Sequence, residues 1–365
     1  MRLLIDAHVF DGAFQGTRTY IEGLYSHMTH YRDIDFYFAA QDINNLRNVF
    51  GIAENIHYVQ LSSSNKWKRL SIDFPRIIED NNIDYAHFQY ISPLIKKCKE
   101  IVTLHDLLFM DYPQFFTLLY RLPKRILFER SAKKSDILLT VSEYSKNSIA
   151  RHFGIDKKKI FITYNSVLPS NDVCNKIGIK NKYGFGKFIL TVSRIEPRKN
   201  HLALLKAYNE LKLWSKGYHL VMVGVKDLQY QELFAYLDKL DTIIKEKVHM
   251  IQVPFEDLVA LYKEASLFVF PSYGEGFGIP PLEAIAYGCP ILCSNATAMA
   301  EFELPEQISF SPDNIEELKL KMMNQLEKPL SNSLYYERIL AKYDWHNISE
   351  CFYKLLKNCD PKVCY

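Results

Sequence analysis

The chain has 365 residues, of which 48% are apolar and 24% are charged, and its formal net charge is +3. This length exceeds what one hydrophobic core usually serves, so we expect two domains, and the nearly balanced charge gives no sign of a nucleic-acid partner. No apolar run approaches the ~20 residues that a bilayer span needs, and the first residues lack the apolar core and cleavage site of a signal peptide, so we expect a cytoplasmic protein.

The cysteine pattern argues against a disulfide-stabilised or zinc-binding protein. The cysteines are odd in number, are scattered and include no C-x2-C pair; they are Cys98, Cys174, Cys289, Cys293, Cys351, Cys359 and Cys364. Free thiols are the expectation for such a pattern, and we predict no metal site.

Strand-like and helix-like segments alternate through the first half of the chain. The strand candidates are residues 2–8, 36–40, 83–90, 100–106 and 135–142, and the helical stretches are residues 15–28, 67–80 and 145–153. Such alternation predicts a parallel sheet with helices on both faces.

Two segments of this half combine basic residues with aromatic or aliphatic ones: Lys66–Arg69 (KWKR) and Phe115–Lys134 (FFTLLYRLPKRILFERSAKK). The second is typical of a helix that lies on an anionic membrane surface. It also fits a helix that faces the core and keeps a solvated basic side. Both interpretations stay open. If the helix lies on a membrane surface, the protein is cytoplasmic and bound peripherally to the inner face of the membrane.

A break follows Val167, where residues 168–187 are polar, contain glycine and favour turns, as an interdomain linker does. A second series of strand candidates then occupies residues 188–194, 219–225, 247–253, 266–272 and 290–295. We predict a domain at 1–168, a linker at 169–184, a second domain at 185–344 and a last segment at 345–365. Each domain is expected to be a doubly wound parallel sheet that binds ligands at the carboxyl ends of its strands.

The segment Pro271–Ile291 (PSYGEGFGIPPLEAIAYGCPI) is the most informative part of the chain. It begins at the end of the apolar run 265–272, which has the length and composition of a buried parallel strand. Pro280 and Pro281 stand where the first turn of a helix tolerates proline, and Gly288 ends that helix. A strand, a glycine-rich loop and a helix N-terminus together form a site for anions, and a diphosphate suits it.

Two glutamates, Glu275 and Glu283, stand eight residues apart in this segment. Carboxylates accept pairs of hydroxyl hydrogen bonds, so sugar and ribose diols are their natural partners beside a phosphate. Glu283 alone would be interpreted as a solvated helix-surface residue. Glu275 lies in a loop between two glycines, so helix propensity does not explain why a glutamate occurs there. The segment therefore predicts a site for a sugar attached to a nucleotide diphosphate.

Several short motifs occur in the order typical of one enzyme family. They are Gly16, His105–Asp106, Thr140–Ser145 (TVSEYS), Tyr164, Ser193–Asn200 (SRIEPRKN), Gly224 after LVMV, Glu275-x7-Glu283 around GFGIP, and Asp344–Trp345. With these motifs, the chain resembles glycosyltransferase family 4 over close to its full length. The resemblance implies the GT-B fold of that family, in which two Rossmann-like doubly wound domains face a central cleft and the last helix, within residues 345–365, crosses back to the first domain.

The resemblance assigns roles to residues of the second domain. Arg194 and Lys199 match the residues that grip the diphosphate, Glu275 matches the glutamate beside the donor sugar, and Glu283 matches the one that binds the ribose hydroxyls. Backbone amides of the loop and helix start are expected to meet sugar and phosphate; they belong to Gly276, Phe277, Gly278, Ile279 and Leu282. The base is expected near Val253.

In the first domain, Gly16 is expected in a turn between the first strand and the first helix, close to the diphosphate, with Thr17 beside it. The sequence Gln15-Gly16-Thr17 departs here from the more common double glycine of the family, which weakens any role for Gln15. His105 ends a predicted strand and matches a histidine that contacts the donor sugar. We therefore expect His105, Glu275, Lys199 and Arg194 to form the catalytic set.

The resemblance implies a retaining hexosyltransferase that moves a hexose from UDP-glucose or GDP-mannose to a glycan or lipid-linked acceptor in polysaccharide biosynthesis. No metal or other cofactor is expected, so cationic side chains must stabilise the leaving UDP or GDP. Front-face substitution is the expected route, since nothing places a second carboxylate beneath the anomeric carbon. The alternatives are a catalytically weak scaffold subunit that binds sugar nucleotides and a GT-B epimerase or phosphorylase.

Overall fold

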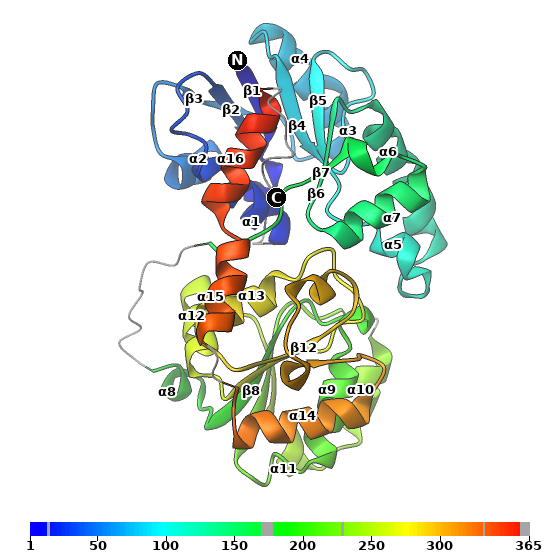
Figure 1. Cartoon of the computed structure of the whole chain (residues 1–365), viewed down its shortest axis with the longest axis vertical. Coiled ribbons are helices and arrows are strands. Elements are labelled where there is room, and N and C mark those ends of the chain that lie inside the picture. Colours follow the sequence, from blue (N-terminus) through cyan, green and yellow to red (C-terminus); the bar gives the residue numbers. More distant parts are fainter. Residues whose placement is uncertain (13–14, 169–177, 228–229, 331–332, 358–365) are drawn as a thin grey trace. The chain divides into compact units, whose positions relative to one another are not determined.

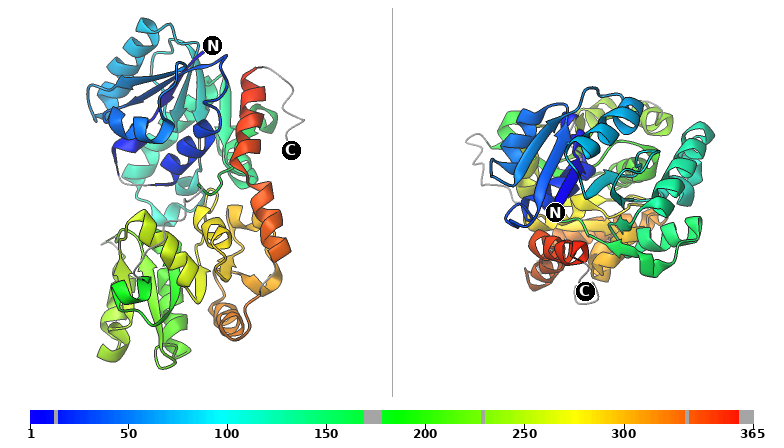
Figure 2. Two further views of the ribbon diagram at one scale, coloured as in Figure 1. Left: turned by 90° about the vertical axis from the view of Figure 1, so that its left-hand side faces the viewer. Right: turned by 90° about the horizontal axis from the view of Figure 1, so that it is seen from above.

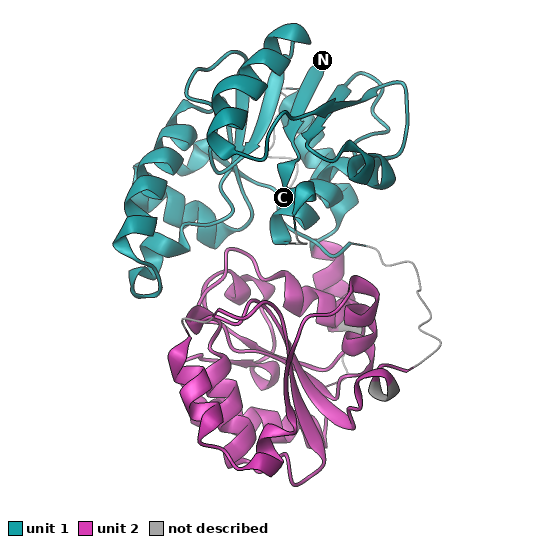
Figure 3. Ribbon diagram, turned by 180° about the vertical axis from the view of Figure 1, so that it is seen from behind, with its two compact units in different colours: residues 1–168, 343–365 teal, residues 169–342 magenta. Residues whose placement is uncertain are grey.

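The computed structural model describes residues 1–12, 15–168, 178–227, 230–330 and 333–357. The chain forms two compact units (Figure 3), of which the first contains Met1–Leu168 and Tyr343–Tyr365 and the second contains Pro169–Lys342. No helix of these described ranges is long and apolar enough to cross a membrane. Each unit is built on its own parallel sheet.

The described residues of the first unit form a seven-stranded parallel sheet in the order β3-β2-β1-β4-β5-β6-β7. The strands are β1 Arg2–Asp6, β2 Asp35–Ala40, β3 Ile56–Gln60, β4 Tyr85–Gln89, β5 Lys99–Thr103, β6 Ile137–Thr140 and β7 Ile160–Ile162. Strand β4 is buried along its whole length, as expected for a parallel sheet that is covered on both faces. The strand order reverses between β1 and β4, which pair directly.

Only some helices of the first unit begin at a residue whose side chain caps them. The helices are η1 His8–Asp11, α1 Gly16–Ser26, α2 Ile43–Phe50, α3 Lys66–Lys68, η2 Arg69–Asp73, α4 Phe74–Asp80, α5 Leu108–Asp111, η3 Pro113–Phe115, α6 Leu118–Lys134, α7 Glu143–Phe153 and η4 Lys157–Lys159. Helix α7, for example, begins after Ser142, whose side chain accepts the backbone N–H of Ser145, and ends at Gly154 with a φ of 64°.

The last described helix, α16 (Trp345–Leu356), also belongs to the first unit. It packs on α1, as the red and blue helices show in Figure 1 and, from a second side, in Figure 2. Trp345 is 2% exposed, and its indole ring fills the space that any side chain at Gly23 would need. Ser349 Oγ donates a hydrogen bond to the carbonyl of Leu24 at 2.8 Å. Helix α16 therefore covers the outer side of α1.

The described residues of the second unit form a six-stranded parallel sheet in the order β10-β9-β8-β11-β12-β13. The strands are β8 Lys187–Val192, β9 Tyr218–Val223, β10 Val248–Ile251, β11 Leu267–Phe270, β12 Ile291–Ser294 and β13 Ser309–Phe310. Strands β11 and β12 are wholly buried. This order is that of a doubly wound Rossmann-like sheet.

The helices of the second unit precede, connect or follow these strands along the chain. They are α8 Ile179–Tyr183, η5 Pro197–Lys199, α9 His201–Glu210, α10 Gln231–Asp238, α11 Thr242–Lys245, α12 Phe255–Glu264, α13 Ile279–Ala286, η6 Thr297–Phe302, η7 Glu306–Ile308, α14 Ile315–Glu327 and α15 Ser333–Lys342. Helix α8 falls inside the segment predicted as a linker, of which 169–177 lies outside the described residues. It is tied to α12, since Tyr183 Oη and Lys182 Nζ both bond to Asp257.

Candidate functional site

The strand order of the second unit reverses between β8 and β11, which pair directly. Open parallel sheets bind ligands at the carboxyl ends of their strands at such a point of reversal. Two segments leave the sheet there, Ser193–Asn200 after β8 and Pro271–Gly278 after β11. Both contain residues that the sequence predicts for the donor site.

Lys199 and Glu275 meet at this point, where Lys199 Nζ lies 2.5 Å from Glu275 Oε1. Arg198 Nη1 lies 3.5 Å from Glu275 Oε2, and Arg198 also donates to the carbonyl of Gly274. These three charged side chains are almost entirely buried, at 11–12% exposure. Burial alone would raise the pKa of Glu275, but the adjacent Lys199 and Arg198 outweigh it and hold that pKa below its ordinary value. Glu275 is therefore an ionised carboxylate between two cations.

Arg194 lies apart from this cluster. Its side chain is 62% exposed, and its Nε lies 3.5 Å from Glu196 Oε2. The short helix η5, which begins with Pro197, carries Arg198 and Lys199, and Arg198 Nη2 lies 2.6 Å from the other Glu196 oxygen. The structure thus brings the predicted Lys199 to Glu275, and it adds Arg198, which the sequence did not single out.

The loop after Glu275 requires glycine at its end. Gly278 has a φ of 103°, and a Cβ atom there would lie 3.2 Å from Met299 Cγ. Phe277 is buried and packs edge-on against Phe302, with ring centroids 5.6 Å apart, so its side chain anchors the loop. Helix α13 then begins at Ile279. The amides predicted to meet a ligand, at Gly276 and along the start of α13 to Leu282, thus lie at the carboxyl edge of the sheet beside Glu275.

Glu283, in α13, is held by the neighbouring helix α12. Tyr262 Oη donates a hydrogen bond to Glu283 Oε2 at 2.8 Å, and Tyr262 is itself only 1% exposed. Burial raises the pKa of Glu283, and the Tyr262 bond opposes this rise only in part. Among the described residues, none bonds to Glu283 Oε1, so one carboxylate oxygen stays available for the ribose hydroxyls that the resemblance implies.

A third segment, after β12, supports Glu275 from behind. Thr297 Oγ1 accepts the backbone N–H of Glu275 at 2.8 Å. Thr297 has a φ of 54°, in the left-handed region that β-branched residues seldom adopt, and such strain persists only where the surroundings enforce it. The strained backbone of Thr297 holds its hydroxyl against the Glu275 loop.

Replacement of Thr297 by valine keeps the shape of the side chain and removes the hydroxyl acceptor. We expect Thr297→Val to lower the free energy of unfolding of the second unit by about 1–3 kcal/mol, because the Glu275 N–H loses its partner. Thr297→Ser retains the acceptor and is expected to stay within about 0.5 kcal/mol of the wild type. Urea unfolding followed by circular dichroism measures both, and equal losses in the two variants would contradict the role of the hydroxyl.

His105 lies at the carboxyl edge of the first sheet, two residues beyond β5. It is 7% exposed, its Nε2 lies 2.8 Å from Oε1 of Gln89 at the end of β4, and Tyr20 packs edge-on against its ring at 5.0 Å. Burial lowers the pKa of His105 to about 3, so the imidazole is neutral near pH 7. A neutral ring that donates its Nε2–H to Gln89 keeps Nδ1 as a hydrogen-bond acceptor.

Buried histidines should make this protein sensitive to mild acid. Burial lowers the pKa of His87, His105 and His201 to about 3 each, whereas the ordinary value is 6.5. The unfolded chain therefore binds more protons below pH 6.5, and stability is lost as the pH falls from 6.5 toward 3. At pH 5 each histidine removes roughly 2 kcal/mol. We expect a clearly lower urea midpoint at pH 5 than at pH 7; equal midpoints would contradict these pKa values.

Three other residues predicted for the donor site lie at the start of α1 or after β10. Gly16 and Thr17 are the first two residues of α1, with Gln15 as the N-cap, so Gly16 lies in a helix and not in the expected turn. The difference arises because the chain leaves β1 through the short helix η1 and α1 begins directly at Gly16. Val253 lies two residues beyond β10, half-buried at the carboxyl edge of the second sheet.

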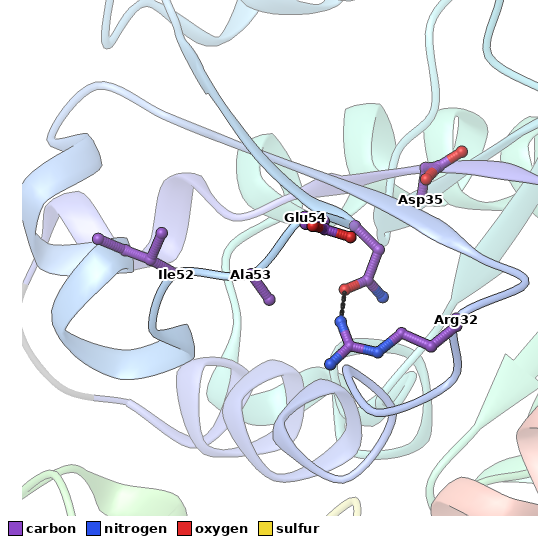
Figure 4. A pocket seen from close by; sticks show the side chains of 6 residues that line it. Arg32, Asp35, Ile52, Ala53 and Glu54 are labelled. Atoms are coloured by element: carbon purple, nitrogen blue, oxygen red, sulfur yellow. Dashed lines mark hydrogen bonds between the residues drawn. The ribbon is translucent and has the colours of Figure 1, made fainter.

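A surface hollow of ≈ 700 Å³ lies elsewhere in the first unit (Figure 4), lined by Arg32, Asp35, Ile52, Ala53, Glu54 and Asn55. Arg32 reaches across it to bond Asn55 Oδ1 at 2.9 Å, as the dashed line shows. Asp35 is the first residue of β2, so the hollow lies at the amino ends of the strands. Parallel sheets bind ligands at the opposite edge, and we do not assign the hollow to the site.

The chain has two doubly wound parallel units, and the second unit has a buried cluster of two cations and a carboxylate where its strand order reverses. This combination fits the class of GT-B glycosyltransferases. Residues 175–357 match the family described as "Glycosyl transferases group 1", and residues 16–170 match "Glycosyltransferase Family 4". The chain belongs to this glycosyltransferase family.

Similarity to named glycosyltransferases and to a solved structure supports this membership. The chain is 31% identical over 264 residues to an O-antigen chain mannosyltransferase of Salmonella typhimurium, which covers 71% of this chain and 69% of that protein. It is 27% identical over 278 residues to O-antigen chain mannosyltransferase B of Escherichia coli, with 72% of each chain covered. The fold is also that of sucrose-phosphate synthase from Thermosynechococcus elongatus, with a TM-score of 0.73, 16% identity and 98% of each chain covered.

Proposed function

We propose that this glycosyltransferase moves a mannosyl group, with retention of configuration, from a nucleotide diphosphate donor to a glycan or lipid-linked acceptor in polysaccharide biosynthesis. The buried cluster of Lys199, Arg198 and Glu275 is the observation that carries the proposal. The two mannosyltransferases named above support mannose as the sugar. They therefore favour GDP-mannose over UDP-glucose, the other donor that the family resemblance suggests.

In this proposal the cations of the cluster bind the donor diphosphate. Lys199 and Arg198 have already lost most of their water, so their attraction to charge that develops on the leaving group is weakly screened. Glu275 holds both cations in place before the donor binds and accepts hydroxyl hydrogen bonds from the donor sugar. Arg194, exposed on the same loop, is proposed to complete the grip on the diphosphate.

The proposed reaction is a substitution on one face of the sugar. The bond between the anomeric carbon and the diphosphate oxygen breaks, and the acceptor oxygen forms its bond to the same carbon from the same side. The acceptor proton passes to the departing phosphate oxygen, so the nucleotide diphosphate leaves as GDP or UDP. Because Lys199, Arg198 and Arg194 supply the positive charge, we propose that the enzyme needs no metal and no other cofactor.

Ligand binding and donor turnover together test this proposal. We expect GDP and GDP-mannose to raise the thermal midpoint of the purified protein more than UDP and UDP-glucose do, since a ligand at 100 times its Kd adds ~2.7 kcal/mol. We also expect slow release of GDP from GDP-mannose that persists in the presence of a chelator. Binding without any release would favour the scaffold alternative, and no binding of any of the four nucleotides would overturn the proposal.

Helix α6 supports the proposal of a peripheral membrane contact. Its first half exposes a stripe of aliphatic side chains, the α6 surface, made of Leu118 (64% exposed), Leu119 (89%), Leu122 (56%) and Ile126 (68%). Only its second half turns residues such as Phe128 and Ala132 into the core. Because basic residues interleave with this stripe, the α6 surface suits the headgroup region of an anionic bilayer.

The double variant Leu119→Gln/Ile126→Gln tests this contact. We expect the wild type to sediment with vesicles that contain phosphatidylglycerol and the variant to remain largely in the supernatant. Leu320→Gln, which alters an exposed leucine of α14 (62%), is the control and should behave as the wild type does. The contact is disproved if the wild type stays in the supernatant at every salt concentration.

A further inference from the structure

Arg69 is a buried cation whose side chain has no hydrogen bond within the described part of the chain. It begins η2, a π-helical turn between α3 and α4, and its side chain is 7% exposed. The nearest carboxylate oxygen, Asp6 Oδ1, lies 3.8 Å from Nε, which is too far for a hydrogen bond. Only Nε is fully buried without a partner, whereas the two terminal nitrogens, which carry four of the five N–H donors, reach the surface and can meet a ligand. Such a set of donors at one place points to a ligand that accepts hydrogen bonds.

The position of Arg69 is that of a ligand site in a parallel sheet. Asp6, its neighbour, is the last residue of β1, and β1 pairs with β4 where the strand order of the first unit reverses. Asp6 forms an ion pair with Arg69 but no hydrogen bond, and its Oδ1 accepts from the His8 ring at 2.7 Å. Asp73, one turn further along η2, is likewise engaged and accepts two hydrogen bonds from Ser62. Both acidic neighbours of Arg69 therefore have other partners.

Two further cations belong to this group, since Lys66 lies near Arg69 and near Lys124. Lys66, in α3, and Lys124, in α6, are both half-buried. Burial lowers the pKa of Lys66, and the nearby charges of Lys124 and Arg69 lower it further. Three cations from α3, η2 and α6 thus lie near one another, and Asp6, which faces Arg69, balances only one of their charges. The remaining positive charge favours a further anion among them.

Exposed apolar side chains adjoin these cations on the same elements. Trp67 and Ile72, on α3 and η2, are 54% and 56% exposed. Tyr120 of α6 lies under Lys124, whose Nζ is 3.6 Å from the ring centroid, and the α6 surface continues from there. A ligand that fits this edge combines an anionic head with an apolar chain.

We propose that Arg69, Lys66 and Lys124 form a phosphoryl-binding subsite that holds the phosphate or diphosphate of a lipid-linked acceptor. The assignment rests on the proposed transferase function and names the chemical class of its acceptor. A phosphoryl group suits this site because its oxygens match the planar fork of a guanidinium in a bidentate contact, while lysine supplies point charges around it. The lipid chain of the acceptor lies along Trp67, Ile72 and the α6 surface.

Binding of farnesyl diphosphate, a water-soluble prenyl diphosphate, tests the subsite. Titrations are made with saturating GDP present, so that the donor site is filled. We expect Arg69→Met to weaken binding at least tenfold and Lys124→Gln to weaken it severalfold. Lys133→Gln, which alters an exposed lysine of α6 paired with Glu129, is the matched control and should leave the Kd unchanged. Farnesol, which lacks the diphosphate, should bind equally poorly to all four proteins.

Two further measurements separate this inference from others. The thermal shift that GDP causes should be unchanged in Arg69→Met, which shows that the variant is folded and that its donor site is intact. If the wild type binds GDP but not farnesyl diphosphate, the subsite is overturned while the proposed transferase function stands. Sedimentation with phosphatidylglycerol vesicles distinguishes the acceptor from bulk lipid. If Arg69→Met loses vesicle binding while it still binds farnesyl diphosphate, the site serves membrane headgroups and the acceptor assignment is wrong.

Discussion

Replacement of Glu275 by alanine is expected to lower the rate of sugar transfer at least about tenfold, a loss of ~1.4 kcal/mol of transition-state stabilisation. Glu275 is the ionised partner of both Lys199 and Arg198, so its removal releases two cations that must hold a defined geometry around the diphosphate. Lys199→Ala is expected to reduce the rate by at least as much, because it removes a desolvated cation from the leaving group. Steady-state transfer from GDP-mannose measures both effects.

The same two variants should also lose stability. Removal of one partner of a buried ion pair leaves the other charge uncompensated, at about 3–5 kcal/mol. The double variant Lys199→Ala/Glu275→Ala should therefore lose less stability than the sum of the single variants. Assays must be run well below the unfolding midpoint of each variant, and the folded fraction measured alongside.

Glu210→Gln is the matched control for this site. It also breaks an ion pair of the second unit, but Glu210 is 46% exposed and pairs with Lys319 at the surface. Such pairs contribute at most ~1 kcal/mol, so we expect near-normal turnover. The site assignment fails if Glu275→Ala or Lys199→Ala turns over as fast as this control.

Trp345→Ala is also expected to have a large effect on stability, a loss of about 3–5 kcal/mol from the first unit. Trp345 is 2% exposed between α16 and α1, and alanine would leave a cavity against Gly23 and the ring of Tyr20, whose centroid lies 6.3 Å from that of the indole. Urea unfolding followed by circular dichroism measures the loss. Trp67→Ala is the control, since that side chain is 54% exposed and should contribute little to stability.

Gly23→Ala tests the same contact from the other side. A methyl group there would overlap the Trp345 ring, and overpacking of this kind costs about 1–3 kcal/mol. In the Trp345→Ala background the methyl group has room, so the two losses should be clearly less than additive. Strict additivity would show that Gly23 and Trp345 do not share this space.

Much of the fold could be predicted from the sequence because parallel strands leave a strong signal. Runs such as SLFVFPS are apolar on both faces, and the strand β11 lies inside that run. The helix start at Pro280 and Pro281 was predictable from the fixed φ of proline and is observed in α13. The GT-B fold and the glycosyltransferase family, both implied by the ordered motifs, are confirmed.

The site was predictable where short motifs mark single residues. Lys199 and Glu275 were each predicted from such motifs, but their ion pair, which joins residues 76 positions apart, was not, and nothing in the sequence ranks Arg198 above Arg194. The structure distinguishes the two arginines, because Arg198 lies in η5 beside Lys199 whereas the side chain of Arg194 is exposed. Thr297 and Gln89 act through hydrogen bonds to residues 22 and 16 positions away, and such contacts exist only once the sheets have formed. The roles of the predicted residues in catalysis stay predictions.

The return of α16 to the first unit has a consequence for the order in which the protein matures. Met1–Leu168 leaves the ribosome first, but its helix α1 stays uncovered until Trp345 has been synthesised, after the whole of Pro169–Lys342. Domains generally fold as units during synthesis, so the second unit can reach its final structure while the first is still incomplete. The half of the enzyme that is made first is therefore finished last, and during that interval it exposes an apolar helix face to chaperones and to misassembly.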